Sequence, residues 1–224
     1  MFTQTKSKIL GTVLSGILSI LFLSSCEETL DVDEDSLVRI CVKTGKHSQS
    51  CASGFWVTSH HFLTAEHVVH KRINEKLIVT VTKNGEDFES KKSRILRVDT
   101  ENDLALIEVR DFESESWLRF CDRVDVFDQV YIARIHDNYF QTQYGYTYWI
   151  GKDWVYFTFK AWGGWSGSPI INSEAECVAS VLKFSNSKTE RSSGGPKLER
   201  IKFFLENNKA AFGGIGEGLK YRER

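Results

Sequence analysis

The chain has 224 residues, of which 41% are hydrophobic and 26% are charged, and its formal net charge is −1. This length suits one large or two small folded domains with a sizeable core. The near-neutral charge and the lack of a basic stripe argue against a nucleic acid as partner.

Residues 1–25 have the pattern of a secretory signal peptide. A start that contains Lys6 and Lys8 precedes an apolar run, Ile9–Leu23, which is too short for a comfortable transmembrane span. The run ends in Leu-Ser-Ser-Cys, which resembles a bacterial lipobox. This resemblance implies cleavage before Cys26 and lipidation of that cysteine, and ordinary signal cleavage beside an unrelated cysteine is the alternative. We therefore expect a lipoprotein anchored in the membrane of a bacterial cell envelope through Cys26, facing the periplasm or the cell surface.

Residues 26–36 are rich in acidic side chains, which predicts a solvated tether. The four cysteines beyond the tether could form disulfides in an exported chain, but four cysteines allow three pairings and the sequence does not select one. Unpaired core cysteines are an equally good interpretation for at least two of them. None of these cysteines has the spacing of a metal site, and there is no C-x-x-C. These cysteines are Cys41, Cys51, Cys121 and Cys177.

Short alternating segments separated by turn signals dominate the next part of the chain, residues 37–112. Asn84-Gly85 is a strong signal for a hairpin turn. Residues 111–122 are charged and less regular, which indicates a connection between two halves. The strands expected in the first half are Leu37–Lys43, Gly54–Thr58, Phe62–Thr64, Lys76–Thr82, Arg94–Val98 and Asp103–Val109.

The second half, residues 113–210, is expected to contain strands at Asp128–Arg134 and Cys177–Phe184 and a two-stranded hairpin within Tyr139–Phe159. Ser185–Pro196 is polar and rich in Gly and Ser, which predicts a surface loop. Beyond it, apolar residues at helical spacing predict an amphipathic helix at 197–208, and residues 211–224 are expected to form a flexible tail. Many short strands with one C-terminal helix indicate an all-β protein built as two barrels or a sandwich.

Three short motifs contain the residues of a Ser-His-Asp triad. His67 lies in Leu-Thr-Ala-Glu-His-Val-Val, Asp103 begins Asp-Leu-Ala-Leu-Ile, and Ser166 lies in Gly-Gly-Trp-Ser-Gly-Ser-Pro. Glycines beside a serine leave its oxygen clear of bulk and let backbone N–H groups converge on one point, as a nucleophile in acyl transfer requires. For the serine motif alone, an ordinary Gly/Ser turn before a strand is the alternative.

These motifs resemble those of the trypsin-like, chymotrypsin-fold serine peptidases, especially their bacterial Deg-type and glutamyl-endopeptidase-like branch, over roughly residues 37–207. The resemblance implies two six-stranded antiparallel barrels of the chymotrypsin type and a C-terminal helix. It also implies that Ser166 is the nucleophile, that His67 takes its proton, and that Asp103 orients the imidazole. The backbone N–H groups of Gly164 and Ser166 would form the oxyanion hole.

The same resemblance implies where substrate would bind. Ser180, Val181 and Leu182 would belong to the strand that pairs with the substrate backbone. Lys160 precedes Ser166 by six residues, which is the offset of the base of the primary pocket in the animal relatives. A lysine there would favour an acidic side chain before the cleaved bond, and a water-facing lysine is the alternative.

Two positions near the motifs leave alternatives open. Asp99 competes with Asp103 for the acid role, and Asp103 is preferred because it directly precedes the Leu-Ala-Leu strand. Trp165 stands where these peptidases usually have Asn or Asp, and its indole could narrow the site.

For the histidines, a metal site is the alternative to the triad, although the H-E-x-x-H pattern is absent. Its candidate ligands are His60, His61, His67 and His70.

The sequence therefore predicts a lipid-anchored serine endopeptidase that hydrolyses protein or peptide substrates through an acyl-enzyme. We expect it to act as a monomer and to need no metal or organic cofactor. One alternative is a peptidase-fold lipoprotein that binds a partner protein without cleaving it. Another is an esterase-like hydrolase that uses the same triad.

Overall fold

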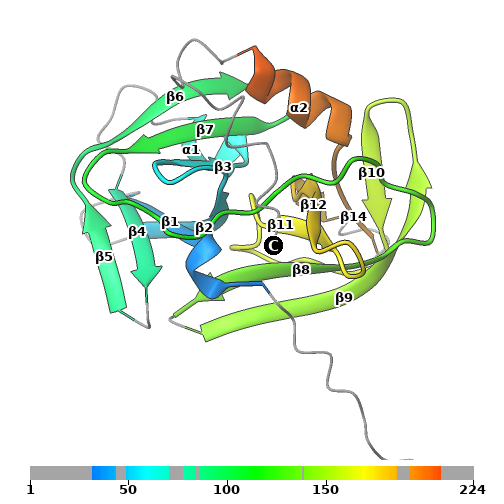
Figure 1. Ribbon diagram of the computed structural model, residues 1–224, viewed down its shortest axis with the longest axis horizontal. Helices are drawn as coiled ribbons and strands as arrows, with labels where there is room; N and C mark the ends of the chain where they lie inside the picture. Colours follow the sequence, from blue (N-terminus) through cyan, green and yellow to red (C-terminus); the bar gives the residue numbers. More distant parts are fainter. Residues whose placement is uncertain are drawn as a thin grey trace, which may run out of the picture. The chain divides into compact units, whose positions relative to one another are not determined.

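The computed structural model describes residues 32–43, 49–70, 78–83, 86–137, 139–185 and 192–207. These residues form two seven-stranded antiparallel sheets and two α-helices (Figure 1). Cys26, the predicted signal peptide, the Asn84-Gly85 turn and the predicted tail lie outside the described residues. No helix within the described ranges is long and apolar enough to cross a membrane.

The first sheet combines strands that are almost wholly buried with strands that are largely exposed or half-buried. Its strands are β1 (Leu37–Lys43), β2 (Gln49–Trp56), β3 (His61–Thr64), β4 (Ile78–Lys83), β5 (Glu86–Ser90), β6 (Ser93–Asp99) and β7 (Leu104–Val109). They are hydrogen-bonded in the order β5-β4-β1-β2-β3-β7-β6. This order pairs β3 with β7, so the residues that follow β3 lie beside those that precede β7.

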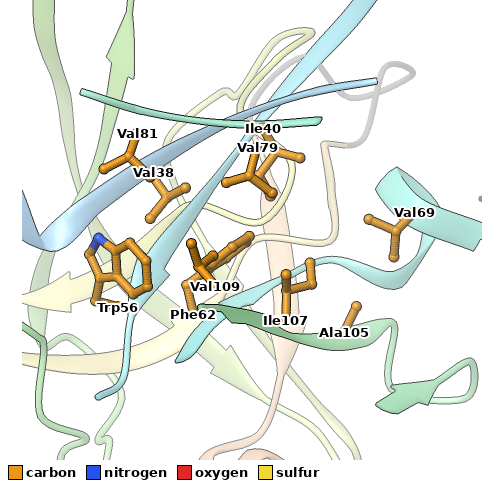
Figure 2. Close-up of a cluster of buried hydrophobic side chains, with 10 residues drawn as sticks. All are labelled: Val38, Ile40, Trp56, Phe62, Val69, Val79, Val81, Ala105, Ile107 and Val109. Atoms are coloured by element: carbon orange, nitrogen blue, oxygen red, sulfur yellow. The ribbon is translucent and has the colours of Figure 1, made fainter. Parts of the chain in front are cut away.

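An apolar cluster fills the inside of the first sheet (Figure 2). Trp56 and Phe62 are fully buried in it, and their rings meet edge to face at 5.6 Å. Burying side chains of this size stabilises the fold by roughly 1.5–3 kcal/mol each. The other buried members are Val38, Ile40, Val69, Val79, Val81, Ala105, Ile107 and Val109.

The second sheet includes two long neighbouring strands and several short ones (Figure 1). Its strands are β8 (Gln129–His136), β9 (Tyr139–Ile150), β10 (Trp154–Phe157), β11 (Pro169–Asn172), β12 (Cys177–Val181), β13 (Phe184–Ser185) and β14 (Ser193–Pro196). They are ordered β12-β11-β8-β9-β10-β14-β13. β8 also packs against β1 and β2 of the first sheet.

This architecture confirms the predicted all-β fold of the chymotrypsin type, but it differs from the prediction in some elements. Each sheet has seven strands rather than six. Ser193–Pro196 was predicted to lie in a surface loop, but it forms β14, which is buried and pairs with β10 and β13. Gly and Pro are poor strand formers, so the local sequence disguised a strand that pairing with its neighbours stabilises.

Two short α-helices and a short 3-10 helix, η1 (Glu34–Ser36), complete the fold. α1 (Glu66–Val69) was not predicted, and it follows β3 directly. α2 (Leu198–Glu206) lies within the predicted C-terminal helix and buries its apolar face. Arg97 of β6 lies over the Phe204 ring at 5.8 Å from its centroid, which fixes the helix beside the first sheet.

The sequence left open whether the four cysteines are paired, and in the structure they form two disulfides. Cys41 and Cys51 face each other across β1 and β2 and are bonded. Cys121, in the connection between the halves, is bonded to Cys177 of β12. The second disulfide holds the connection against the second sheet, where Phe120 also bridges to Val178.

Candidate active site

His67 and Asp103 are brought together by the pairing of β3 with β7. His67 lies in α1 just after β3, and Asp103 directly precedes β7. The His67 Nδ1–H donates to Asp103 Oδ2 at 2.8 Å, and the His67 backbone N–H donates to Oδ1 at 2.8 Å. Asp103 has a φ of 56°, a left-handed conformation that Asp adopts more readily than most residues. Both carboxylate oxygens are therefore fixed on His67.

The hydrogen bond to Asp103 also decides the protonation of the imidazole. It raises the pKa of His67 above its ordinary value, against an opposing effect of burial; the charges of Asp103 and Glu66 raise it further and Lys183 lowers it. A carboxylate can only accept, so Nδ1 holds the proton of the neutral ring and Nε2 is left as the proton acceptor. The side chain of His67 is 47% exposed whereas that of Asp103 is 5% exposed. The pair thus presents an oriented base to solvent.

The residues that were alternatives to the triad, Asp99 and the other histidines, make contacts elsewhere. Asp99 accepts hydrogen bonds from the backbone N–H of Asn102 at 3.0 Å and from its side-chain amide at 2.8 Å, so Asp99 fixes the turn before β7. Among the described residues, no three His, Cys, Asp or Glu side chains gather as a metal site requires. The other histidines near the site bond to separate partners: His60 to Phe112 O, His61 to Thr58 and His70 to Glu66.

The turn that contains Ser166 is held against the first sheet by Ser53. The Ser53 N–H donates to Ser166 O at 2.9 Å, and the Ser53 hydroxyl donates to Gly164 O at 2.9 Å. Gly167 has a φ of +83°, and a Cβ there would lie 2.2 Å from both Ser53 O and Thr64 Oγ1. The serine turn therefore packs directly on β2 and on the end of β3, just before the helix that contains His67.

Backbone N–H groups suited to an oxyanion hole lie in the same turn. The N–H groups of Gly164 and Ser166 donate to no atom of the described residues, whereas the Gly167 N–H donates to Leu182 O and the Ser168 N–H to Trp165 O. Likewise, Ser166 Oγ makes no hydrogen bond to His67 within the described residues, and such bonds are often long before substrate binds. The two N–H groups are therefore available to an oxygen that becomes negatively charged during a reaction.

A cleft beside the imidazole was not predicted from the sequence. It has a volume of about 450 Å³, and its lining residues are Glu66, His67, Thr100, Asp103 and Lys183. Lys183 Nζ lies 4.2 Å from the centroid of the Trp154 ring, so the amine is partly fixed there. The position of Lys183 immediately after the strand assigned to substrate was the only sequence signal for it.

The residues predicted to pair with substrate are buried in the second sheet. The Ser180 hydroxyl donates to Pro196 O at 2.8 Å, and Val181 pairs with Pro169 of β11. Leu182 uses both its N–H and its carbonyl on the serine turn, through Ser168 O and the Gly167 N–H. These three residues lie next to the turn, and their pairing with a substrate stays a prediction.

Lys160 and Trp165 lie on either side of the glycine pair that begins the serine turn. Ser193 fixes the segment around Lys160, because its hydroxyl donates to Phe159 O at 3.0 Å and accepts from the Ala161 N–H at 3.1 Å. Lys160 is partly buried and does not line the cleft beside His67, so its role in a primary pocket stays a prediction. Trp165 is 3% exposed and belongs to the apolar core of the second sheet.

Comparisons with solved structures support the fold. An astrovirus serine protease is 19% identical with a TM-score of 0.56, and the alignment covers 75% of this chain and 91% of the viral chain. The Rv3671c protease of M. tuberculosis, in its active form, is 17% identical with a TM-score of 0.65, over 77% of this chain and 80% of its own. A serine endoprotease from Yersinia pestis is 16% identical with a TM-score of 0.64, and the alignment covers 78% of this chain and 62% of the Yersinia chain.

The amino-acid sequence was also compared with known proteins and with models of protein families. No curated protein matches the chain at a significant level. Residues 52–179, however, match the family model described as the trypsin-like peptidase domain. The matched range is more than half of the chain and includes His67, Asp103 and Ser166. On this evidence the chain belongs to the trypsin-like peptidase domain family.

Proposed function

We propose that the protein is a serine endopeptidase in which Ser166, His67 and Asp103 act as a catalytic triad. The observation that supports this most directly is the hydrogen bond of 2.8 Å between His67 Nδ1 and Asp103 Oδ2, formed beside a glycine-flanked serine turn. The family to which the chain belongs acts on proteins, so peptide bonds are the expected substrates.

In this mechanism Ser166 Oγ attacks the carbonyl carbon of the substrate while its proton moves to His67 Nε2. Asp103 stabilises the imidazolium that forms and keeps its tautomer fixed. The N–H groups of Gly164 and Ser166 bind the oxyanion, and each donor is worth about 3 kcal/mol of the barrier. His67 then protonates the leaving amine, and water hydrolyses the acyl-enzyme by the reverse sequence.

The proposal also includes the cellular location and the specificity expected from the sequence. Lipidation of Cys26 would anchor the enzyme to the membrane of a bacterial envelope, facing the periplasm or the cell surface. Lys160 would favour an acidic residue before the cleaved bond, because its offset from Ser166 matches that of the base of the primary pocket in the animal relatives.

A fluorophosphonate probe, which reacts only with an activated serine, tests the triad. We would label the full chain in detergent beside Ser166→Ala, and beside Ser168→Ala as the matched control, since Ser168 is a fully buried serine two residues away. Labelling of the parent and of Ser168→Ala but not of Ser166→Ala is the expected result. A well-folded parent that stays unlabelled would favour the alternative, a peptidase-fold lipoprotein that binds its partner without cleavage.

Two further measurements separate the finer parts of the proposal. Turnover of peptides as well as simple esters is expected of an endopeptidase, and turnover of esters alone would indicate the esterase alternative. For the anchor, Cys26→Ser should abolish incorporation of labelled palmitate and release the chain from the membrane fraction; unchanged incorporation would exclude Cys26 as the lipid site.

A further inference from the structure

Arg134 of β8 is a buried cation next to the serine turn. It is only 8% exposed, and its hydrogen bonds within the described residues go to neutral oxygens rather than to a carboxylate. Nε and Nη2 donate to Gln141 Oε1 at 3.0 and 2.8 Å, and Nη1 donates to Gly163 O at 3.2 Å. Burying a charge is costly unless its hydrogen bonds are satisfied, so these contacts fix the guanidinium in one place.

The guanidinium also stacks on the residue before the proposed nucleophile. Arg134 Cζ lies 4.4 Å from the centroid of the Trp165 ring. Trp165 is 3% exposed and belongs to the core of the second sheet, so it is a rigid platform. Arginine is suited to this combination, because its planar group can stack through its face and donate hydrogen bonds through its edge.

The contact with Gly163 determines which way the next N–H points. No peptide in the described chain is cis, so the carbonyl of Gly163 and the N–H of Gly164 point in opposite directions. With the carbonyl held at Arg134, the Gly164 N–H is directed to the other side of the turn. The next carbonyl, Gly164 O, is held separately by the Ser53 hydroxyl at 2.9 Å.

The glycine pair needs such an external constraint. Gly164 has a φ of +86°, and a Cβ there would lie 2.7 Å from Arg134 Nη1, so only glycine lets the guanidinium approach this closely. Two successive glycines have little conformational preference of their own. Without the guanidinium, the peptide between Gly163 and Gly164 could rotate and turn a carbonyl oxygen towards the position of the oxyanion.

We infer that Arg134 is a positioning residue that fixes the Gly163–Gly164 peptide so that the Gly164 N–H is available to the oxyanion. The inference rests on the proposed function for its catalytic consequence, but its structural part stands independently. Arg134 does not touch the reacting atoms. It acts through one peptide group, with Trp165 and Gln141 holding it in place.

Steady-state kinetics on the full chain test the catalytic part. Arg134→Met keeps the length of the side chain but removes its donors, and we expect kcat to fall about 10- to 1000-fold, the upper limit being the loss of one oxyanion donor. KM should change by less than about threefold, and the acid limb of the pH profile should stay in place, because the His67–Asp103 pair is untouched. Arg134→Lys should restore part of kcat. Arg119→Met is the control, since Arg119 also donates to a backbone carbonyl, Ala175 O, outside the site.

A second variant covers the case in which Arg134→Met fails to fold. Gln141→Leu removes the acceptor that orients the guanidinium and should lower kcat in the same direction by a smaller factor. A kcat equal to that of the parent in Arg134→Met, or in Gln141→Leu if Arg134→Met is unfolded, would overturn the inference. A variant in which kcat falls and KM changes by the same factor would also overturn the inference.

Crystal structures of the parent and of Arg134→Met separate this inference from the proposed function. A rotated or disordered Gly163–Gly164 peptide in the variant is the expected result. An unchanged peptide would overturn the inference even if the parent proved inactive. A rotated peptide in a chain whose parent has no activity would uphold the positioning role and refute only the proposed function.

Discussion

Replacing Gly167 with alanine tests whether the serine turn must pack directly on the first sheet. The new Cβ would lie 2.2 Å from Ser53 O, 2.2 Å from Thr64 Oγ1 and 2.9 Å from the Ala65 nitrogen. Two of these three atoms are backbone, which cannot rotate away as the end of a flexible side chain can. The φ of +83° adds strain for any residue with a Cβ.

The expected cost follows from these two contributions. Left-handed backbone costs a non-glycine residue roughly 1–2 kcal/mol, and forcing an extra carbon into a packed site costs about 1–3 kcal/mol. Gly167→Ala should therefore lower the free energy of unfolding by about 2–5 kcal/mol, which corresponds to a drop in Tm of roughly 4–20 °C for a chain of this size. Because relief requires the serine turn to move off β2 and β3, labelling of Ser166 by fluorophosphonate should also slow.

Urea unfolding and probe labelling measure both effects, with Gly163→Ala as the matched control. Gly163 has no atom within 4 Å of its added Cβ, so this variant should stay within about 0.5 kcal/mol of the parent. If Gly167→Ala were as stable as Gly163→Ala, the close approach of the turn to Ser53 and Thr64 would be refuted.

Other predictions concern the disulfides and the pH dependence. Replacing both cysteines of the Cys121–Cys177 disulfide by alanine should lower the free energy of unfolding by about 4.2 kcal/mol, because the bond closes a separation of 56 residues. The same change at Cys41–Cys51, which closes a separation of 10 residues, should lower it by about 2.7 kcal/mol. Urea titrations that gave the reverse order would contradict this. Activity should fall as the pH drops through the raised pKa of His67, because only the neutral imidazole accepts a proton. Glu66→Gln should move this acid limb to lower pH, since the Glu66 charge raises the pKa of His67. Lys183→Met should move the limb to higher pH, and pH–rate profiles shifted in the opposite directions would refute both assignments.

Sequence patterns predicted the parts of the fold that local residues determine. Strand β1 was predicted with the observed bounds, Leu37–Lys43, because its apolar and polar side chains follow an approximate period of two. The helix α2 was expected from apolar residues at helical spacing, and the hairpin of β9 and β10 from the density of aromatic residues in Tyr139–Phe159. The contact between His67 and Asp103 was implied by the resemblance of their motifs to those of the trypsin-like serine peptidases.

Features that depend on contacts between distant segments could not be predicted. The Ser-Gly-Gly-Pro sequence of β14 predicts a loop because it has low strand propensity. The segment forms a strand only because it pairs with β10 and β13. The disulfide pairing follows from the register of β1 with β2 and from the path of the connection, neither of which spacing reveals. Arg134 escaped notice because its contact with Gly163 joins residues 29 positions apart.

Neither disulfide joins a strand of the first sheet to a strand of the second. The serine turn and the histidine are instead held together by reversible contacts, chiefly the two hydrogen bonds that Ser53 donates to Ser166 O and Gly164 O. Turnover would therefore report on whether the two sheets are docked, and not only on whether each is folded. A mild chaotrope that separates the two sheets should abolish the proposed turnover while the strands of each sheet still protect their amides from exchange. Dilution of the chaotrope should restore the turnover without any redox step.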